Sequence, residues 1–413
     1  MTRQVIIGNS AAGLSAITAI REIDDSSQII LISAEDCNAY SPVALTYYLK
    51  GSIPREGLSI VDSSFYKVNE VKTLFGSKAI SVNDLRQTVN LENGREVKYD
   101  NLLIATGAFP ISLTSSDNGL KNVFVLRAIA DAEKILKCTQ NAKEVIVIGA
   151  GLIGLQTADA LFRKGMKLAI IEWSSQVLPE SIDIGCAEIV QKEIERRGIS
   201  VLLNEKVNEI RKKGKKAVII LDSGKKIAAD MVVVGVGLKP NMQLVEHSGI
   251  NVDRGILVDS TMRTNISNIF AAGDVSQGEN LVNGKKEVLP NWCNACRQGR
   301  IAGLNMAGKK QIYEGGLRET IATIFGLTIA VTGMSKSVGC KGAEELCFAD
   351  PDRQYYRKLV FIGDRIVGMV LLNRVADAGL LGSFIRNRKE IASGKDEITR
   401  TSWDIRKLLT PVR

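Results

Sequence analysis

The chain has 413 residues, of which 45% are hydrophobic and 24% are charged, and its formal net charge is +9. This length gives room for two or three domains, and no apolar run reaches the roughly 18 residues that a membrane-spanning helix needs. Strand-like residues begin at Gln4, so we expect no signal peptide and a soluble, cytoplasmic protein. Seven cysteines without a framework pattern indicate reduced thiols.

The positive charge gathers in short patches, such as RKKGKK from Arg211 and RNRKE from Arg386. Patches of this kind are usually solvated loops or helix faces, and the alternative is a surface for an acidic partner protein. No nucleic-acid-binding motif accompanies them, so we expect no nucleic-acid partner.

Strand-like runs alternate with helical patterns in the first two thirds of the chain. QVIIG precedes a helix that begins near Ala11, and QIILIS follows it; the same order recurs as EVIVIG, a helix from Leu152 and KLAIIE. These two βαβ units predict two parallel sheets of the doubly wound type. Between them, YDNLLIATGAFP predicts a strand that ends in a glycine turn. After them, 207–237 predicts antiparallel strands with charged turns.

The pattern changes from about Tyr313 onward. YRKLVFIGDRIVGMVLLN predicts a hairpin that turns at Gly363 and Asp364, and the apolar run FGLTIAVTG predicts a further strand. GLLGSFIRNRKEI predicts a helix. We therefore expect a third domain of the α+β class.

The second glycine turn, VIVIGAGLIG, has the spacing of a dinucleotide-binding motif. Gly149 permits the tight turn, Gly151 lets a pyrophosphate approach the backbone, and Gly154 lets the helix pack against the sheet. Glu172 ends KLAIIE, where a carboxylate binds ribose hydroxyls. It would repel a 2′-phosphate, and no arginine follows it, so the turn favours NADH over NADPH. The next residues are Trp173, Ser174 and Ser175.

The first glycine turn, VIIGNSAAG, has Ser10 in place of the second glycine. Gly8 and Gly13 hold the other two positions, and Glu35 stands where the ribose-binding acid belongs. The Cβ atom of a serine narrows the approach to a phosphate. On these residues alone, the turn is either a dinucleotide-binding turn or a purely structural βα turn.

Seven motifs run in one order: VIIGNSAAG, YSPVALTYYLKG, LLIATGAFP, VIVIGAGLIG, QVLPESID, GVGLKPN and ILVDSTMRTNISNIFAAGDV. On these motifs the chain resembles the pyridine nucleotide-disulfide oxidoreductase superfamily, in which an NAD-binding domain is inserted into an FAD-binding domain. The resemblance implies that the first turn holds FAD and the second holds NADH. It also implies that Asp274 binds the ribityl or pyrophosphate part of FAD.

The implied fold is α/β, with two Rossmann-like dinucleotide-binding domains, the NAD domain inserted in the FAD domain, and a C-terminal α+β domain. We expect the FAD-binding domain at 1–115 and 242–315, the NAD-binding domain at 116–241 and an interface domain at 316–413. No catalytic or metal-binding residue is predicted. The predicted cofactor-binding residues are Gly8, Ser10, Ala12, Gly13, Glu35, Ala105, Thr106, Gly107, Gly149, Gly151, Ile153, Gly154, Glu172, Gly237, Gly273 and Asp274.

Thiol chemistry is not expected at the flavin. Disulfide reductases of the superfamily place a cysteine there, and the resemblance puts Val43 at that position, while Cys37 does not match it. Cys293 and Cys296 form a C-x-x-C motif. Such a motif can be a redox pair or half of a metal site, but it is more commonly two thiols packed on a helix. The single histidine, His247, fits a surface or helix-end position better than a catalytic base.

Without a thiol relay, we expect electrons to pass from NADH through FAD to an external acceptor. The segment LPNWCNACRQGRIAGLNMAG resembles one branch of the superfamily in particular. This branch contains the FAD-binding parts of NADH-dependent nitrite reductases, the rubredoxin reductases and the NAD-linked flavin subunits of multi-subunit oxidoreductases. The expected acceptor is an iron–sulfur protein or a partner subunit, because such acceptors are usually acidic and this chain is basic. The alternatives are an NADH oxidase that forms hydrogen peroxide and a flavoprotein that senses NADH. We expect a homodimer or a hetero-oligomer and no membrane contact.

Overall fold

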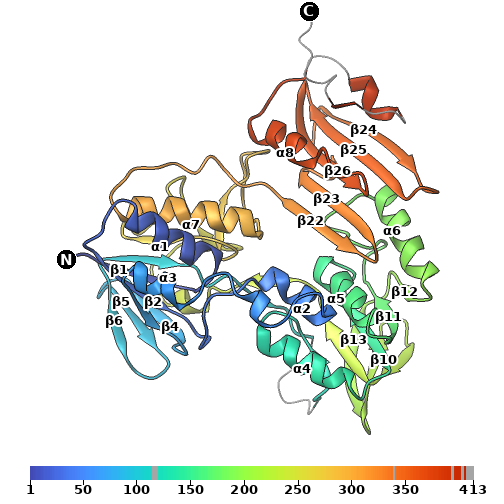
Figure 1. Cartoon of the computed structure of the whole chain (residues 1–413), viewed down its shortest axis with the longest axis horizontal. Coiled ribbons are helices and arrows are strands. Elements are labelled where there is room, and N and C mark those ends of the chain that lie inside the picture. Colours follow the sequence, from blue (N-terminus) through green and yellow to red (C-terminus); the bar gives the residue numbers. More distant parts are fainter. Residues whose placement is uncertain (114–119, 338–339, 392–394, 401–403, 406–413) are drawn as a thin grey trace, which may run out of the picture. The chain divides into compact units, whose positions relative to one another are not determined.

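The computed structural model describes residues 1–113, 120–337, 340–391, 395–400 and 404–405 (Figure 1). Their contacts form two compact units, each built from three stretches of the chain. Unit 1 contains Met1–Val43, Arg55–Phe109 and Leu238–Leu317, and unit 2 contains Ala44–Pro54, Pro110–Gly237 and Arg318–Arg413. The chain therefore leaves unit 1 and later returns to it.

Unit 1 is built on a parallel sheet with the strand order β19-β7-β1-β2-β3. β1 from Val5 onward and β2 from Ile29 onward are apolar and buried, which is typical of parallel strands covered on both faces. Helix α1 (Ala11–Arg21) connects these two strands, so the first predicted βαβ unit is confirmed. The strands are β1 (Arg3–Ile7), β2 (Gln28–Ile32), β3 (Val71–Leu74), β7 (Asn101–Ile104) and β19 (Ile269–Ala271).

Helices α1 and α7 (Trp292–Met306) pack backbone against backbone, and they lie side by side in Figure 1. A methyl group on Gly299 would lie 2.1 Å from the carbonyl oxygen of Ala12, and one on Gly303 would lie 2.5 Å from that of Ala16. Only glycine fits at both positions of α7. This close contact fixes where α7 begins relative to the end of β19.

Smaller elements complete unit 1. An antiparallel meander, which the sequence analysis did not predict, consists of β4 (Ala79–Asn83), β5 (Thr88–Leu91) and β6 (Glu96–Lys98). The other α-helix and strands are α3 (Ser63–Val68), β17 (Leu238–Pro240), β18 (Ile256–Leu257), β20 (Ser276–Glu279), β21 (Lys286–Glu287) and, at the boundary with unit 2, β8 (Ala108–Pro110).

Unit 2 contains a second parallel sheet, with the strand order β12-β11-β10-β16-β9. Helix α5 (Leu152–Phe162) connects β10 to β11, so the second predicted βαβ unit is confirmed. Helices α2 (Leu45–Lys50), α4 (Ile129–Thr139) and α6 (Ile184–Arg196) belong to the same unit. The strands are β9 (Val123–Phe124), β10 (Glu144–Ile148), β11 (Lys167–Ile171), β12 (Ser200–Leu202) and β16 (Met231–Val234).

The stretch 207–237 differs in part from the prediction. Strands β13 (Val207–Lys213), β14 (Lys216–Leu221) and β15 (Lys226–Ala229) are antiparallel, as expected. The prediction is wrong for β16, which pairs in parallel with β10. All four residues of β16 are buried and apolar, so the strand is covered on both faces, as interior parallel strands are.

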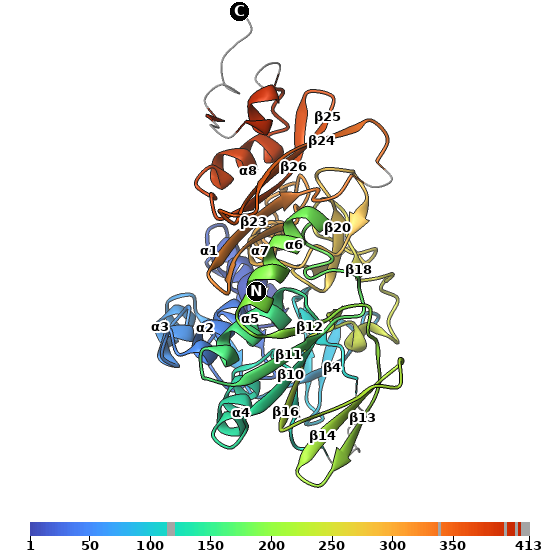
Figure 2. The ribbon, with the colours of Figure 1, turned by 90° about the vertical axis from the view of Figure 1, so that its right-hand side faces the viewer.

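The C-terminal part of unit 2 is an antiparallel sheet with the order β22-β23-β26-β25-β24. The predicted hairpin is confirmed, since β25 and β26 pair with Ile362 opposite Arg365 and Gly363 lies in the turn. The predicted helix is α8 (Ala378–Arg386), which packs on β23 and β26 (Figure 2). The strands are β22 (Glu319–Ile324), β23 (Leu327–Gly333), β24 (Ala343–Asp350), β25 (Tyr355–Ile362) and β26 (Arg365–Leu372).

A buried lysine joins this antiparallel sheet to α6. The Nζ atom of Lys358, on β25, lies 2.6 Å from the Oδ2 atom of Asp183 and 2.7 Å from the Oε2 atom of Glu345. The hydroxyl of Tyr356 donates to the same Asp183 oxygen at 2.8 Å. Asp183 also caps α6, because it accepts a hydrogen bond from the N–H of Cys186. One carboxylate therefore starts the helix and holds the sheet against it.

Glu193 forms a second contact between α6 and the antiparallel sheet. Its carboxylate accepts hydrogen bonds from Arg196, Arg197 and, across the contact, from the side-chain amide of Gln354 at 2.7 Å. The hydrogen bond from Arg196 is the main cause that lowers the pKa of Glu193 to about 2, and burial of the carboxyl acts against it. The charged form of Glu193 therefore stabilises the folded chain.

Replacing Glu193 by glutamine should lower the free energy of unfolding by about 1–3 kcal/mol near neutral pH. The folded pKa lies below the unfolded value of about 4.3, so this stabilisation is complete above about pH 5 and is lost as the pH falls toward 2. Urea unfolding at neutral pH and near pH 3 should show a gap between wild type and E193Q that narrows in acid. Glu195→Gln, at an exposed position of α6, is the control. A gap of the same size at both pH values would contradict the assignment.

Candidate functional site

The predicted residues of unit 1 follow the carboxyl ends of four strands of its parallel sheet. Gly8 follows β1, Glu35 follows β2, Ala105 follows β7 and Gly273 follows β19. In open parallel sheets, ligands bind outside the carboxyl ends of the strands. The structure thus brings segments that are far apart in the sequence to one edge of one sheet.

The first glycine turn is too tight for any side chain at two positions. Gly8 has a φ of +125°, and a methyl group on it would lie 2.1 Å from the carbonyl oxygen of Ala105. A methyl group on Gly13 would lie 2.0 Å from the carbonyl oxygen of Gly8. Ser10 is the N-cap residue of α1, and its side chain makes no cap hydrogen bond to the helix residues described. The Ser10 hydroxyl and the N–H groups of the first turn of α1 therefore suit an anion.

The carboxylate of Glu35 is accessible and held in place. Glu35 is exposed, and the hydroxyl of Tyr40 donates to its two oxygens at 2.8 and 3.1 Å. The Oγ atom of Ser33 donates to the backbone carbonyl of Glu35 at 3.0 Å. Each carboxylate oxygen can accept a further hydrogen bond, so Glu35 suits a ribose with two hydroxyls.

Hydrogen bonds hold the segments that follow β7 and β19 at this edge. The Oγ1 atom of Thr106 donates to the carbonyl of Asn241 at 2.8 Å, and the N–H of Asn241 donates to the carbonyl of Gly107 at 2.9 Å. The buried Gln298, on α7, accepts a hydrogen bond from the N–H of Gly273 at 2.8 Å, next to the half-buried Asp274. The sequence analysis missed Gln298, because the hydrogen bond joins residues 25 positions apart and no local pattern marks it.

The predicted residues of unit 2 occupy the same kind of edge. Gly149 follows β10, Glu172 follows β11, and 235–237 follow β16. Gly149 has a φ of +101°, and a methyl group on it would lie 2.4 Å from the carbonyl oxygen of Gly235. A methyl group on Gly154 would lie 1.9 Å from the carbonyl oxygen of Gly149. These contacts hold the turn, the following helix and the next strand end together.

Gly151 and Ile153 face a more open part of this edge. A methyl group on Gly151 would meet no atom of the described residues within 4 Å. Gly151 has an ordinary extended backbone and is the N-cap residue of α5, and the Ile153 side chain is partly exposed. The role predicted for Gly151, a close approach of phosphate to the backbone, therefore fits the space in front of it.

Glu172 is buried, with only 3% of its surface exposed. One of its carboxylate oxygens accepts a hydrogen bond from the N–H of Ala150 at 2.6 Å, and the other accepts one from the N–H of Ser174 at 2.9 Å. Glu172 therefore ties the end of β11 to the glycine turn, a role that the sequence did not predict. Its remaining lone pairs can still accept hydrogen bonds from a ribose at this edge.

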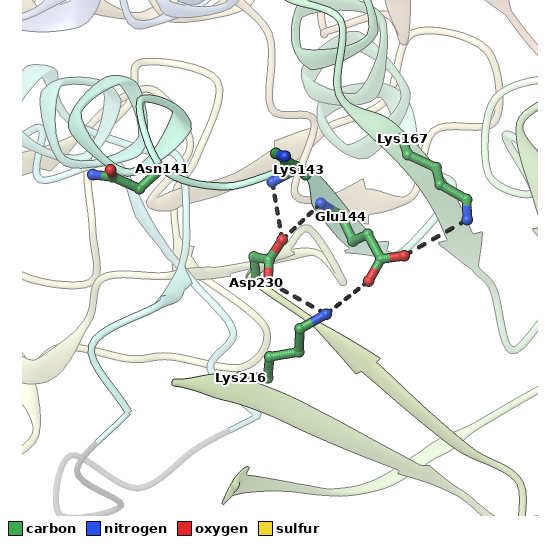
Figure 3. A pocket seen from close by; sticks show the side chains of 6 residues that line it. All are labelled: Asn141, Lys143, Glu144, Lys167, Lys216 and Asp230. Atoms are coloured by element: carbon green, nitrogen blue, oxygen red, sulfur yellow. Dashed lines mark hydrogen bonds and ion pairs between the residues drawn. The ribbon is translucent and has the colours of Figure 1, made fainter. Parts of the chain in front are cut away.

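A hollow of about 510 Å³ lies at the opposite edge of this sheet, where β10 and β11 begin (Figure 3). Asp230 accepts hydrogen bonds from the N–H groups of Lys143 and Glu144, and these lower its pKa. Lys216 lies 2.8 Å from Glu144 and 3.5 Å from Asp230. The charges pair with one another, so we interpret the hollow as a structural ion network. The residues that line it are Asn141, Lys143, Glu144, Lys167, Lys216 and Asp230.

The thiols do not form an evident reactive site. Val43 is more than half exposed, and Cys37 is half-buried, which raises the pKa of its thiol. Cys293 is exposed and Cys296 half-buried in the first turns of α7, and burial also raises the pKa of Cys296. In the described ranges, no group of three His, Cys, Asp or Glu side chains could hold a metal ion. None of the described helices is both long and apolar enough to cross a bilayer.

Comparisons with known proteins agree with this geometry. The family described as pyridine nucleotide-disulphide oxidoreductase matches residues 2–299. The chain belongs to this family. Its members are oxidoreductases, and the cofactors of this chain are FAD and NAD(H). Both glycine turns lie within the matched residues.

Three similar proteins illustrate the range of reactions for which pyridine nucleotide-disulphide oxidoreductases are named. An NADH oxidase from Methanocaldococcus jannaschii is 34% identical over 342 residues, which are 81% of this chain and 76% of that protein. A rubredoxin-NAD(+) reductase from Pseudomonas putida is 30% identical and covers 74% of this chain and 80% of its own. The structure of an NAD-dependent persulfide reductase from A. fulgidus has a TM-score of 0.88, is 27% identical and covers 98% of this chain and 80% of its own. The chain spans about half the length of some other relatives.

Alanine substitutions in the second turn should separate binding from folding. Gly151→Ala should leave the thermal unfolding temperature unchanged, because the added methyl group meets no other atom in the described part of the chain. It should weaken the binding of NAD+ by about tenfold, because the methyl group fills the space into which the pyrophosphate is predicted to fit. Gly154→Ala should lower the free energy of unfolding by about 2–4 kcal/mol, because its methyl group meets the Gly149 carbonyl. Calorimetric NAD+ binding and thermal unfolding measure the two effects. Equal destabilisation by both substitutions would show that the Gly151 position is not open.

Proposed function

We propose that the chain is an FAD-dependent NADH:acceptor oxidoreductase that passes electrons to an iron–sulfur protein or a partner subunit. The observation that carries this proposal is that the same kind of sheet edge occurs in both units. Each unit offers a glycine turn, a helix N-terminus and a carboxylate at the carboxyl ends of its own parallel strands. A chain that must bind two dinucleotides needs two such edges.

The edge of unit 1 is assigned to FAD. Bound FAD supplies the two-electron chemistry between NADH and an acceptor. Gly8, Ser10 and Gly13 let the pyrophosphate reach the N-terminus of α1, and Glu35 accepts hydrogen bonds from the ribose. Asp274 binds the ribityl or pyrophosphate part from the end of β19. The residues Ala12, Ala105, Thr106, Gly107 and Gly273 shape the same edge.

The edge of unit 2 is assigned to NADH. Gly149, Gly151 and Gly154 form the pyrophosphate turn, with Ile153 on the first turn of α5 and Gly237 after β16. Glu172 accepts hydrogen bonds from the ribose and repels a 2′-phosphate. In this proposal the FAD-binding domain comprises 1–115 and 242–315, the NAD-binding domain comprises 116–241, and 316–413 form an interface domain.

The residue at the position of the superfamily's redox-active cysteine favours an external protein acceptor. Val43 cannot carry a thiol relay, so the electrons must leave the protein by another route. The net charge of +9 favours an acidic partner. A relative that is 30% identical is named for rubredoxin, an electron-transfer protein. The competing proposal is an NADH oxidase that reduces oxygen to hydrogen peroxide, and a 34% identical relative named NADH oxidase favours it.

Rapid mixing distinguishes the two acceptors. FAD-loaded protein should lose its flavin absorbance when NADH is added without oxygen, and a ferredoxin or rubredoxin should then restore it faster than buffer alone. The rate should fall as salt is added, because screening weakens the attraction between a basic enzyme and an acidic acceptor. If the flavin absorbance returns no faster with the acceptor protein than with buffer, the proposal of a protein acceptor is wrong. Rapid oxygen consumption with hydrogen peroxide as the product and no partner present would establish the oxidase.

A further inference from the structure

Trp173 is an exposed aromatic residue at the edge assigned to NADH. It follows Glu172 directly, at the carboxyl end of β11, and 70% of its surface is exposed. Indole rings usually bury most of their area. No role predicted from the sequence uses this side chain. An indole left in water beside a binding edge is a surface that a ligand can cover.

The backbone around Trp173 is firmly held. The N–H of Glu172 donates to the carbonyl of Leu202 at 2.8 Å, and the N–H of Ser174 donates to the Glu172 carboxylate at 2.9 Å. The carbonyl of Ser174 accepts a hydrogen bond from the N–H of Asn204 at 3.1 Å. Both neighbours of Trp173 are therefore fixed while its indole is exposed. Such a ring loses little conformational freedom when a ligand covers it.

The position of Glu172 indicates which part of a ligand would reach this ring. Its carboxylate touches the N–H of Ala150 in the glycine turn, so the ribose that it binds lies next to the pyrophosphate. The adenine base is bonded to that ribose, on the side away from the pyrophosphate. A residue adjacent to the ribose-binding acid is therefore within reach of the base. The flat, uncharged face of adenine matches the flat, uncharged face of an indole.

We propose that Trp173 is a stacking platform for the adenine ring of NAD(H). The inference rests on the proposed function, because it assumes that the edge of unit 2 binds the nicotinamide dinucleotide. It adds a residue that recognises the base, while Glu172 recognises the ribose and the glycine turn recognises the phosphates. Since stacking does not act on the nicotinamide, Trp173 contributes to affinity and not to electron transfer.

Calorimetric titration with ADP-ribose, which lacks nicotinamide, tests the platform directly. Trp173→Ala should weaken ADP-ribose binding by about tenfold, and Trp173→Phe should restore most of it, because a phenyl ring also stacks. ADP-ribose should quench the tryptophan fluorescence of the wild type and leave that of W173F unchanged. Because the indole is exposed, both variants should unfold at the wild-type temperature. Ile321→Ala is the control, since Ile321 lies on β22 and is also 70% exposed.

Steady-state kinetics with two reductants give the second test. The kcat/KM for NADH should fall about tenfold in W173A through a higher KM, whereas that for reduced nicotinamide mononucleotide, which has no adenine, should stay at the wild-type value. Wild-type affinity of W173A for ADP-ribose, or equal losses with both reductants, would overturn the platform. If the wild type binds no ADP-ribose and oxidises no NADH, the assignment of the edge fails and the inference with it.

Discussion

The close approach of a glycine backbone to a neighbouring strand end is the constraint on which both candidate sites depend. Gly8 meets the carbonyl of Ala105 in unit 1, and Gly149 meets the carbonyl of Gly235 in unit 2. A side chain at either glycine would push the turn away from the adjacent strand and misplace the helix that follows it. The same backbone contact therefore places the N-terminus of α1 and of α5 at the edge proposed to bind a dinucleotide.

The two edges use their carboxylates differently. Glu35 is exposed and oriented by a tyrosine hydroxyl, whereas Glu172 is buried and joined to two backbone N–H groups. A carboxylate that is already hydrogen-bonded needs no rearrangement to receive a ligand, so both acids are preorganised. In Glu172 the same oxygens also fix the loop that presents Trp173. The proposed ribose-binding group and the backbone beside Trp173 are therefore held by the same carboxylate.

Charged and polar side chains join the antiparallel sheet to α6. Lys358 is buried with two carboxylates around it, and Glu193 gathers two arginines and an amide. Buried ion pairs of this kind add specificity of placement, because removal of one partner leaves an uncompensated charge. The arrangement connects the C-terminal sheet to the helix that follows the second βαβ unit.

The sequence by itself determined the two βαβ units, the C-terminal hairpin and the residue types at each glycine turn, because apolar periodicity and glycine spacing are local signals. The division into three domains and the residue roles stay predictions. Only the tertiary structure decided that β16 joins β10 in parallel, that Gln298 supports the Gly273 turn and that Glu172 braces its own turn. These features join residues far apart in the chain, whose pairing depends on how the strands and helices pack rather than on any local pattern.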